Sequence, residues 1–416
     1  MIALGCIADD FTGGTDVAAG LRRGGMSVAL LFGVPEAGAE VPSTDAVVIA
    51  LKTRTVPAAA AVDDSLRALS WLKSHDVGRV YFKYCSTFDS TDEGNIGPVA
   101  DALLRDLGES MTLICPSSPE HARTTYNGYH FVGHDLLSES SMRFHPLTPM
   151  TDAKLARILQ PQTDGPIGHL ALNTVHEGID AVAGFLKELE TGGVRHVVVD
   201  SVTDADLYTV AAGSRDLRLL TGGAGLAAAL GSNGGGAEES ESVAELPSGP
   251  GIVLAGSCSA ATMQQVSNAA GVFLSYRLDP STTPDPVQMQ DAAVGWLRRN
   301  WEQAPVLIYS SAGPEDRERA RAAMGSQTSE ILERTLGALA AEAVSLGAQR
   351  VVVAGGETSG AVVQALGIST VVIQSEADRG VPWCLTTGEP TLALLLKSGN
   401  FGSADLLVRA MSEGGS

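Results

Sequence analysis

The sequence predicts an α/β protein with two domains, each built on a mainly parallel sheet flanked by helices. Short runs rich in Val, Ile and Leu alternate with Ala- and Leu-rich stretches of helical character, which is typical of βαβ units. One stretch rich in Gly, Ser and Glu, beginning at Gly231, interrupts this alternation. The length of 416 residues favours two or three domains.

Each apolar run gives one expected strand. The expected strands are 2–8, 27–33, 46–51, 79–84, 112–116, 167–173 and 196–200, followed by 251–256, 306–310, 350–356 and 370–374. We therefore predict a first domain over 1–230, a flexible linker over 231–249 and a second domain over 250–416. Residues 117–150 show no clear periodicity, and a long irregular segment in a compact α/β chain is more often functional than idle.

Composition excludes several classes of partner. A formal net charge of −20 argues against binding to nucleic acid or to an anionic membrane surface. The five cysteines are scattered without a CxxC pair, which favours reduced thiols. The opening "MIALGCIADD" has no basic leader and predicts a strand rather than a signal peptide. We therefore expect a cytoplasmic protein that does not contact a membrane.

The first strand runs into "IADDFTGGTD", which places Asp9 and Asp10 at its end. Ligands of open α/β sheets bind at the carboxyl ends of the strands. Two adjacent acids there could orient substrate hydroxyls, accept a proton or bind a metal. We expect Asp16 to cap the following helix and the glycines before it to form a tight turn, but neither role accounts for Asp9 and Asp10.

Several cations follow other strands of the first domain. Lys52 and Arg54 lie two residues apart and would share a face if extended. Lys83 falls inside an apolar strand, where it is costly unless paired, although its head could instead extend to the surface. Asp89 in the loop beyond and Arg123 in the irregular segment are further candidates for substrate binding. Together the cations could bind a carboxylate substrate in this acidic protein.

Two weaker patterns point to other chemistry. His130 and His134 are four residues apart, as in some metal sites, but no HExxH accompanies them and a glycine between them weakens the helix prediction. "TGGAGLAAALG" contains part of a dinucleotide-binding fingerprint, and a lone match of this kind is weak. We expect it to be a turn packed closely against a neighbouring segment.

The second domain carries three glycine-rich loops, "LAGSCSAAT", "AGGETSGAVV" and "LKSGNFG". Exposed N–H groups at a helix N-terminus bind phosphate oxygens even without the Lys of a P-loop. Thr358 or Ser359 could simply cap one helix, and their hydroxyls could also donate to a ligand. Three such loops in one domain favour a nucleotide pocket.

These motifs also resemble a known family. "IADDFTGGTD", "LKTR", "YFKYCSTFDST", "GNIGPV", "HPLTPMTD", "TGGAGLA", "AGSCS", "VVAGGETSG", "GVPW" and "LALLLKSGNFG" occur in order over nearly the whole chain. The sequence resembles the four-carbon acid sugar kinases. Its "YFKYCSTFDST" and "GNIGPV" block is most similar to the 3-oxo-tetronate kinases, with D-threonate and D-erythronate kinases as close relatives.

The resemblance implies an N-terminal acid-sugar domain and a C-terminal ATP domain, with the active site in the interdomain cleft. It implies transfer of the γ-phosphoryl group of ATP to the C4 hydroxyl of a four-carbon sugar acid. Carried over by motif, the ATP contacts are Ser257, Gly356, Glu357, Thr358, Ser359 and Gly399. The acid-sugar side maps onto Asp10, Lys83 and Arg123. Relatives often have Asn-Gly before this Arg, where the chain has His121 and Ala122.

We accordingly predict a kinase that uses ATP and Mg²⁺, with unassigned metal ligands. Asp10, or otherwise Asp9, would accept the hydroxyl proton, while Lys83, Arg123 and Arg54 would bind the substrate carboxylate. The sequence is also compatible with a homodimer. An NAD-dependent dehydrogenase using "TGGAGLA" and a two-lobed sugar-acid binding protein are the alternatives. The sequence does not distinguish 3-oxo-tetronate from D-threonate or D-erythronate.

Overall fold

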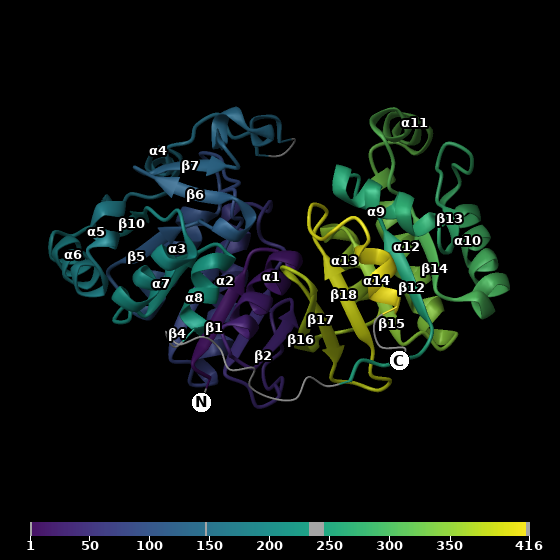
Figure 1. Cartoon of the computed structure of the whole chain (residues 1–416), viewed down its shortest axis with the longest axis horizontal. Coiled ribbons are helices and arrows are strands. Elements are labelled where there is room, and N and C mark those ends of the chain that lie inside the picture. The colour runs from purple at the N-terminus through teal and green to yellow at the C-terminus, as the bar shows by residue number, and fades with distance from the viewer. Residues whose placement is uncertain (1, 146–147, 233–244, 413–416) are drawn as a thin grey trace. The chain divides into compact units, whose positions relative to one another are not determined.

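The structure is a computed structural model that describes residues 2–145, 148–232 and 245–412. The chain divides into two compact units, Met1–Glu241 and Ser242–Ser416 (Figure 1). Both consist of a mainly parallel sheet flanked by helices, which confirms the predicted fold class. In the described part of the chain, every helix is too short or too polar to cross a membrane.

The sheet of unit 1 has the strand order β2-β3-β1-β4-β11-β5-β10-β9. Its strands are β1 (Leu4–Ala8), β2 (Val28–Phe32), β3 (Ala46–Ala50), β4 (Arg79–Lys83), β5 (Thr112–Cys115), β9 (Ile167–Leu170), β10 (His196–Val199) and β11 (Leu219–Gly222). All neighbouring strands in this sheet are parallel. The loops that follow β3, β1, β4, β11 and β5 therefore leave the same edge next to one another.

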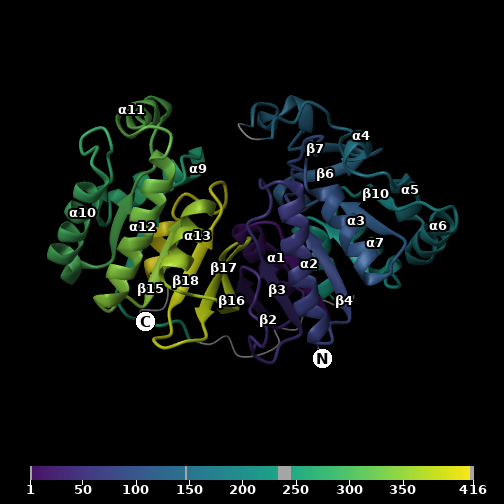
Figure 2. The ribbon, with the colours of Figure 1, turned by 180° about the vertical axis from the view of Figure 1, so that it is seen from behind.

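Helices cover both faces of this sheet. They are α1 (Phe11–Arg23), α2 (Ala58–Ser74), α3 (Ile96–Leu107), α4 (Leu155–Leu159), α5 (Leu172–His176), α6 (Ile179–Thr191), α7 (Asp204–Gly213) and α8 (Ala224–Gly231). Alternate strand residues face opposite layers: a Cβ atom on Gly5 would lie 2.8 Å from Leu72 of α2, whereas Ala50 contacts Gly14 of α1. Helix α8 packs against α1 and α7 on one face, and α2 packs against α3 on the other (Figures 1 and 2).

The segment 117–150 is more regular than its sequence suggested. It contains a small antiparallel sheet of β6 (Arg123–Tyr126), β7 (Tyr129–Val132) and β8 (Asp135–Leu136). Asn127 and Gly128 connect β6 to β7 with φ values of 51° and 68°, the left-handed conformation that a two-residue hairpin requires. Asn-Gly between β-rich runs is a strong hairpin signal, so this element was predictable and was missed.

The sheet of unit 2 has the order β13-β14-β12-β15-β18-β17-β16. Its strands are β12 (Gly251–Ala255), β13 (Leu274–Arg277), β14 (Val306–Tyr309), β15 (Arg350–Ala354), β16 (Thr370–Asp378), β17 (Val381–Thr386) and β18 (Ala393–Lys397). The first five strands in the order are parallel, and β17 runs antiparallel to both of its neighbours. Strands β11, β13, β17 and β18 were not predicted.

The helices of unit 2 also form two layers. They are α9 (Ala260–Ala270), α10 (Pro286–Asn300), α11 (Pro314–Met324), α12 (Thr328–Ser345), α13 (Gly356–Ala365) and α14 (Leu406–Ser412). Helix α9 packs against α14, while α12 packs against α10 and α13 (Figures 1 and 2). A core of Val253, Leu307 and Trp383 lies beneath α9 and α14.

The predicted linker lies only partly within the described residues, since 233–244 are outside them. Gly231 ends α8, so the helix includes the first residue of the predicted linker. At the other end, Pro247 accepts a hydrogen bond from Arg350 (2.7 Å), and the Gly249 amide donates to Gln349 (2.9 Å). The last residues of the predicted linker are therefore bound to unit 2.

Candidate active site

The predicted acidic pair and Arg54 form one ion-paired cluster at the carboxyl edge of unit 1. Arg54 binds Asp9 through Nε and Nη2, each 2.8 Å from a carboxylate oxygen, and its Nη2 also lies 2.8 Å from Asp10 Oδ1. The cluster forms because β3 and β1 are adjacent parallel strands. Lys52 is exposed and lies over the Phe11 ring instead. Arg54 thus holds both acids in place.

Asp10, not Asp16, caps α1. The Asp10 carboxylate accepts hydrogen bonds from the Gly13 amide (2.7 Å) and the Thr12 hydroxyl (3.1 Å), and the helix begins at Phe11. The predicted glycine turn is therefore wrong, because Gly13 lies in the first turns of the helix. A Cβ atom on Gly13 would lie 2.2 Å from Asp10 and 2.9 Å from Lys83 Nζ. Glycine is needed there for close packing.

Nearby charges set the protonation state of Asp10. Burial raises the pKa of Asp10, but the charges of Arg54 and Lys83 and the hydrogen bonds of the helix start outweigh burial and leave it below its usual value. The Asp10 side chain is 26% exposed, whereas that of Asp9 is only 8% exposed. Asp10 is therefore the ionised acid that a ligand can reach more easily.

Lys83 ends β4 and is 3% exposed, so it does not extend to the surface. Its Nζ donates to the Tyr84 carbonyl (2.9 Å). Asp16, in the middle of α1, is also buried, and its Oδ1 has no hydrogen-bond partner among the described residues. Burial raises the pKa of Asp16 to about 7, against the attraction of Lys83. The site thus contains a buried carboxyl group that titrates near neutrality.

Arg123 begins β6, close to the loop that follows β4. Its Nη1 donates to the His121 carbonyl, while its buried Nε has no partner among the described residues. Asp89 accepts a hydrogen bond from the Thr87 hydroxyl (2.6 Å) and contributes to the potential at Arg123. An unsatisfied guanidinium N–H in a buried position is a suitable donor for a carboxylate ligand.

The pair His130 and His134 does not form a helical metal motif. His130 lies in β7, and His134 follows in the next turn. The His130 ring contacts the Ser86 carbonyl (2.7 Å) and the Thr125 hydroxyl (3.1 Å), and burial lowers its pKa to about 4. A neutral His130 therefore anchors the loop after β4 to the hairpin.

Unit 1 contains a cavity of about 550 Å³ at the end of this loop. It is lined chiefly by residues 90–93 and 149–152. It contains three acids, and its cation Arg157 is already paired with Asp152 at 2.6 Å. This cavity is therefore less suited to a carboxylate than the surroundings of Arg123.

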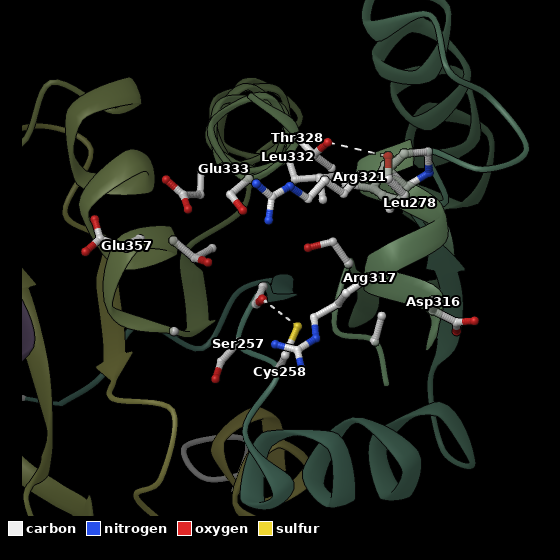
Figure 3. Close-up of a pocket in the computed structure, with 18 of the residues that line it drawn as sticks. Ser257, Cys258, Leu278, Asp316, Arg317, Arg321, Thr328, Leu332, Glu333 and Glu357 are labelled. Atoms are coloured by element: carbon white, nitrogen blue, oxygen red, sulfur yellow. Dashed lines mark hydrogen bonds between the residues drawn. The ribbon is translucent and has the colours of Figure 1, made fainter. Parts of the chain in front are cut away.

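Unit 2 contains a cavity of about 580 Å³ at the carboxyl ends of its parallel strands (Figure 3). The loop Gly256–Cys258 after β12 and the start of α13 from Gly355 to Thr358 form one side. The rest is formed by Arg277, which ends β13, and the three residues after it, by the loop after β14, and by α11, α12 and the turn between them. All of these residues belong to unit 2.

The start of α13 presents backbone donors to this cavity. Gly355 precedes the helix with φ 134°, a conformation that favours glycine. Because the N-cap residue is a glycine, no side chain caps the start of the helix. The amides of Gly356, Glu357 and Thr358 have no acceptor within the helix. Ser359 instead donates both its amide and its hydroxyl to the Gly355 carbonyl, at 2.8 and 2.7 Å. Neither hydroxyl caps the helix, and Thr358 is buried.

The third glycine loop supports this site from behind. The Gly399 carbonyl accepts hydrogen bonds from Ser259 (2.5 Å) and Thr262 (2.8 Å), and a Cβ atom on Gly399 would lie 2.4 Å from Ser257 Oγ. Of the predicted ATP contacts, Ser257, Gly356, Glu357 and Thr358 line the cavity; Ser359 and Gly399 are not among its lining residues. Contact of the last two with nucleotide stays a prediction.

Sequence reasoning missed the arginines of this cavity. Arg277 ends β13 and pairs with Asp316 at 2.5 Å, while Arg317 and Arg321 extend from α11. The i, i+4 spacing of the last two was a signal, because it places both on one face of a helix. Their proximity to the glycine loops depends on the strand order, which the sequence did not reveal.

Comparison with known proteins assigns these two sites to two domains. Residues 4–230 match the family model described as a sugar-binding N-terminal domain, and residues 252–407 match the one described as a nucleotide-binding C-terminal domain. The chain belongs to this family. Asp10, Lys83 and Arg123 thus lie in the sugar-binding domain, and the 580 Å³ cavity lies in the nucleotide-binding domain.

Relatives in this family are similar over their whole length. A 3-oxo-tetronate kinase of Burkholderia multivorans is 45% identical, with 98% of this chain and 96% of the relative covered. A 3-oxo-tetronate kinase of Cupriavidus necator is also 45% identical, over 99% and 96%. The solved structure of a Salmonella typhimurium LT2 protein is 40% identical, with a TM-score of 0.90 and 99% of both chains covered.

Proposed function

We propose that this protein is a 3-oxo-tetronate kinase that transfers the γ-phosphoryl group of ATP to the C4 hydroxyl of its substrate. The observation that carries the proposal is the full-length similarity to kinases of that name, at 45% identity. Each domain also offers groups suited to one substrate. Phosphoryl transfer requires chiefly positioning and charge neutralisation, and both sites consist of groups that provide these.

The nucleotide-binding domain supplies the phosphate donors. A cavity of about 580 Å³ is within the usual size range of small-molecule sites. The amides of Gly356, Glu357 and Thr358 converge at the positive end of α13, and Ser257 adds a hydroxyl from the neighbouring loop. We assign ATP to this cavity, with its phosphates at the start of α13.

Mg²⁺ would complete the phosphate site. Among the described residues, no three His, Cys, Asp or Glu side chains gather as a metal site. Mg²⁺ on a nucleotide typically uses only one or two protein carboxylates, together with phosphates and water. Glu357 lines the cavity and is the carboxylate that would hold it; an acid at this position would otherwise repel the phosphates (Figure 3). The bound ion would neutralise phosphate charge.

The sugar-binding domain supplies the acid-sugar site. Lys83 and the unsatisfied Arg123 guanidinium are assigned to the substrate carboxylate, with Asp89 near Arg123. Asp10 orients the C4 hydroxyl and accepts its proton as transfer proceeds. Asp9 is less suitable, because its side chain is only 8% exposed and both of its oxygens bind the same Arg54 guanidinium. Arg54 then contributes to binding of the substrate carboxylate only indirectly, by holding Asp9 and Asp10 in place. The meeting of the two sites in an interdomain cleft stays a prediction.

The alternative functions lack comparable support. A dehydrogenase would use the glycines of "TGGAGLA", but a Cβ atom would lie 2.6 Å from the Pro116 carbonyl at Gly223 and 2.7 Å from the Ser117 carbonyl at Gly225. These glycines therefore permit close packing against the loop after β5, as the sequence predicted. A non-catalytic sugar-acid binding protein has no counterpart among the relatives described above.

The deciding experiment measures ADP release with 3-oxo-tetronate, D-threonate, D-erythronate and L-threonate at matched concentrations. We expect the highest kcat/KM with 3-oxo-tetronate, and a product phosphorylated at C4 by ³¹P–¹H correlation spectroscopy. ATP consumption with none of the four acids would refute the kinase. A higher kcat/KM for D-threonate or D-erythronate would change the assigned substrate but leave the proposed phosphoryl transfer in place.

A further inference from the structure

The glycine loops of the nucleotide-binding domain contain no available cation. Their one lysine, Lys397, is fully buried, and its Nζ donates to Thr262 Oγ1 and to the carbonyls of Ser398, Gly399 and Phe401 at 3.0–3.2 Å. Burial also lowers the pKa of Lys397 to about 8. Lys397 therefore holds the third loop together. Helix amides alone carry only about half a unit of positive charge, far less than a triphosphate requires.

Helix α11 presents two cations to the same cavity. Arg317 and Arg321 line it, both are exposed, and neither forms an ion pair or a side-chain hydrogen bond with a described residue. Their i, i+4 spacing places their Cβ atoms about 5–6 Å apart along one face of the helix. Figure 3 shows the Arg317 guanidinium beside Ser257 and Cys258, and the Arg321 side chain near Thr328, Leu332 and Glu333.

The ion pair between Asp316 and Arg277 fixes the start of α11 beside the cavity. Asp316, in the first turn, pairs with Arg277 at the end of β13 and also with Arg319. Arg277 is thereby occupied, and the pairing connects α11 to the sheet next to the cavity. Arg319 is on the same helix but is not a lining residue of the cavity. The helix thus presents to the cavity two arginines that have no ion pair with a described residue, while its third arginine, Arg319, is paired with Asp316.

We propose that Arg317 and Arg321 form a two-arginine clamp on the polyphosphate chain of ATP. The clamp supplies the positive charge that the glycine loops lack. Arg317 binds the phosphates nearest the Ser257 loop, and Arg321 binds a neighbouring phosphate one helical turn along. Guanidinium groups suit this role because they donate two parallel hydrogen bonds to phosphate oxygens and no existing ion pair must be broken. This inference rests on the proposed function, since it takes the cavity as the ATP site.

The test compares three single variants of the full chain, Arg317→Met, Arg321→Met and Arg319→Met. Methionine keeps an apolar stem, and the exposed positions make misfolding a small concern that thermal unfolding checks. Isothermal titration calorimetry measures Kd for ATP, ADP, adenosine and inorganic tripolyphosphate. We expect ATP and tripolyphosphate affinity to fall about 10- to 100-fold in Arg317→Met and Arg321→Met, the usual effect of losing a charge-assisted hydrogen bond. Adenosine affinity should not change.

Arg319→Met is the matched control and should retain wild-type affinity for all four ligands. The clamp is refuted if Arg317→Met and Arg321→Met bind ATP as Arg319→Met does, or if they lose adenosine as strongly as ATP. Arg317→Lys provides a second check, because a retained charge without the planar fork should restore only part of the affinity. Failure of the wild-type protein to bind ATP would instead count against the proposed function.

Discussion

Replacing Asp16 with Asn should stabilise unit 1 increasingly as the pH rises toward neutrality. Asp16 is 8% exposed in the middle of α1, and its Oδ1 has no hydrogen-bond partner among the described residues. Burial is the main reason that its pKa rises from 3.8 to about 7. An ionised Asp16 is therefore costly in the folded state, whereas Asn carries no charge at any pH.

The sign follows from proton linkage. Between pH 3.8 and 7 the folded chain holds a proton on Asp16 that the unfolded chain has released. The stability contributed by this proton is fully present below pH 3.8 and is lost as the pH rises through 7. At about 1.4 kcal/mol per pKa unit, the full loss is on the order of 4 kcal/mol. Between pH 5 and pH 8 the advantage of Asp16→Asn should grow by roughly 2–3 kcal/mol.

Hydrogen exchange in increasing urea, followed by mass spectrometry on peptides from β1 and α1, measures the free energy of unfolding of this region at pH 5, 6.5 and 8. Asp45→Asn is the control of opposite sign, since hydrogen bonds from Ser27 lower the pKa of Asp45. That variant should lose stability relative to wild type at neutral pH and approach it at low pH. A difference between Asp16→Asn and wild type that stays constant from pH 5 to pH 8 would refute the reasoning.

Three further variants test the proposed roles by steady-state kinetics. Asp10→Asn should lower kcat at least 100-fold with the KM for ATP within about twofold, the usual effect of losing a general base, and an unchanged kcat would remove Asp10 from the mechanism. Arg123→Met should raise the KM for the sugar acid about 10- to 100-fold, and a matching rise in the KM for ATP would contradict its assignment to the carboxylate. Gly399→Ala places a Cβ atom 2.4 Å from Ser257 Oγ, so it should raise the KM for ATP several-fold. An unchanged value would show that the third loop does not support the phosphate site.

The sequence predicted the central strands well because they are continuous apolar runs, buried on both faces. Two of the strands that it missed, β13 and β17, lack this signal. Strand β13 lies at the edge of its sheet with Leu274 and Arg277 exposed, and β17 contains Pro382. Strand β18 is an apolar run whose type is ambiguous from periodicity alone. The β6–β7 hairpin was missed for another reason. Its sequence does contain a hairpin signal, Asn127-Gly128, which the prediction did not use.

The site was predictable where it follows the rule that ligands of open α/β sheets bind at the carboxyl ends of the strands. That rule placed Asp9, Asp10 and Arg54 at one edge, but it could not show that Arg54 would bind both acids. Nor could local sequence distinguish a glycine turn from a tightly packed helix start, so Asp16 was taken for a cap although it lies inside α1. The structure distinguishes a turn from a helix start because it places Asp10 and Lys83 close against Gly13.

The acidity of the chain makes its few available cations informative. The chain has a net charge of −20, but exposed charges more than a Debye length of about 8–10 Å from a site are largely screened. Local groups therefore set the potential at each strand edge. In the sugar-binding domain Arg54 is already paired with Asp9 and Asp10, and together with Lys83 it lowers the pKa of Asp10. An incoming sugar acid therefore needs a cation outside this ion-paired cluster in addition to Lys83. Arg123, with an unsatisfied buried Nε, has the required donor, which is why its assignment to the carboxylate is stronger than that of Arg54.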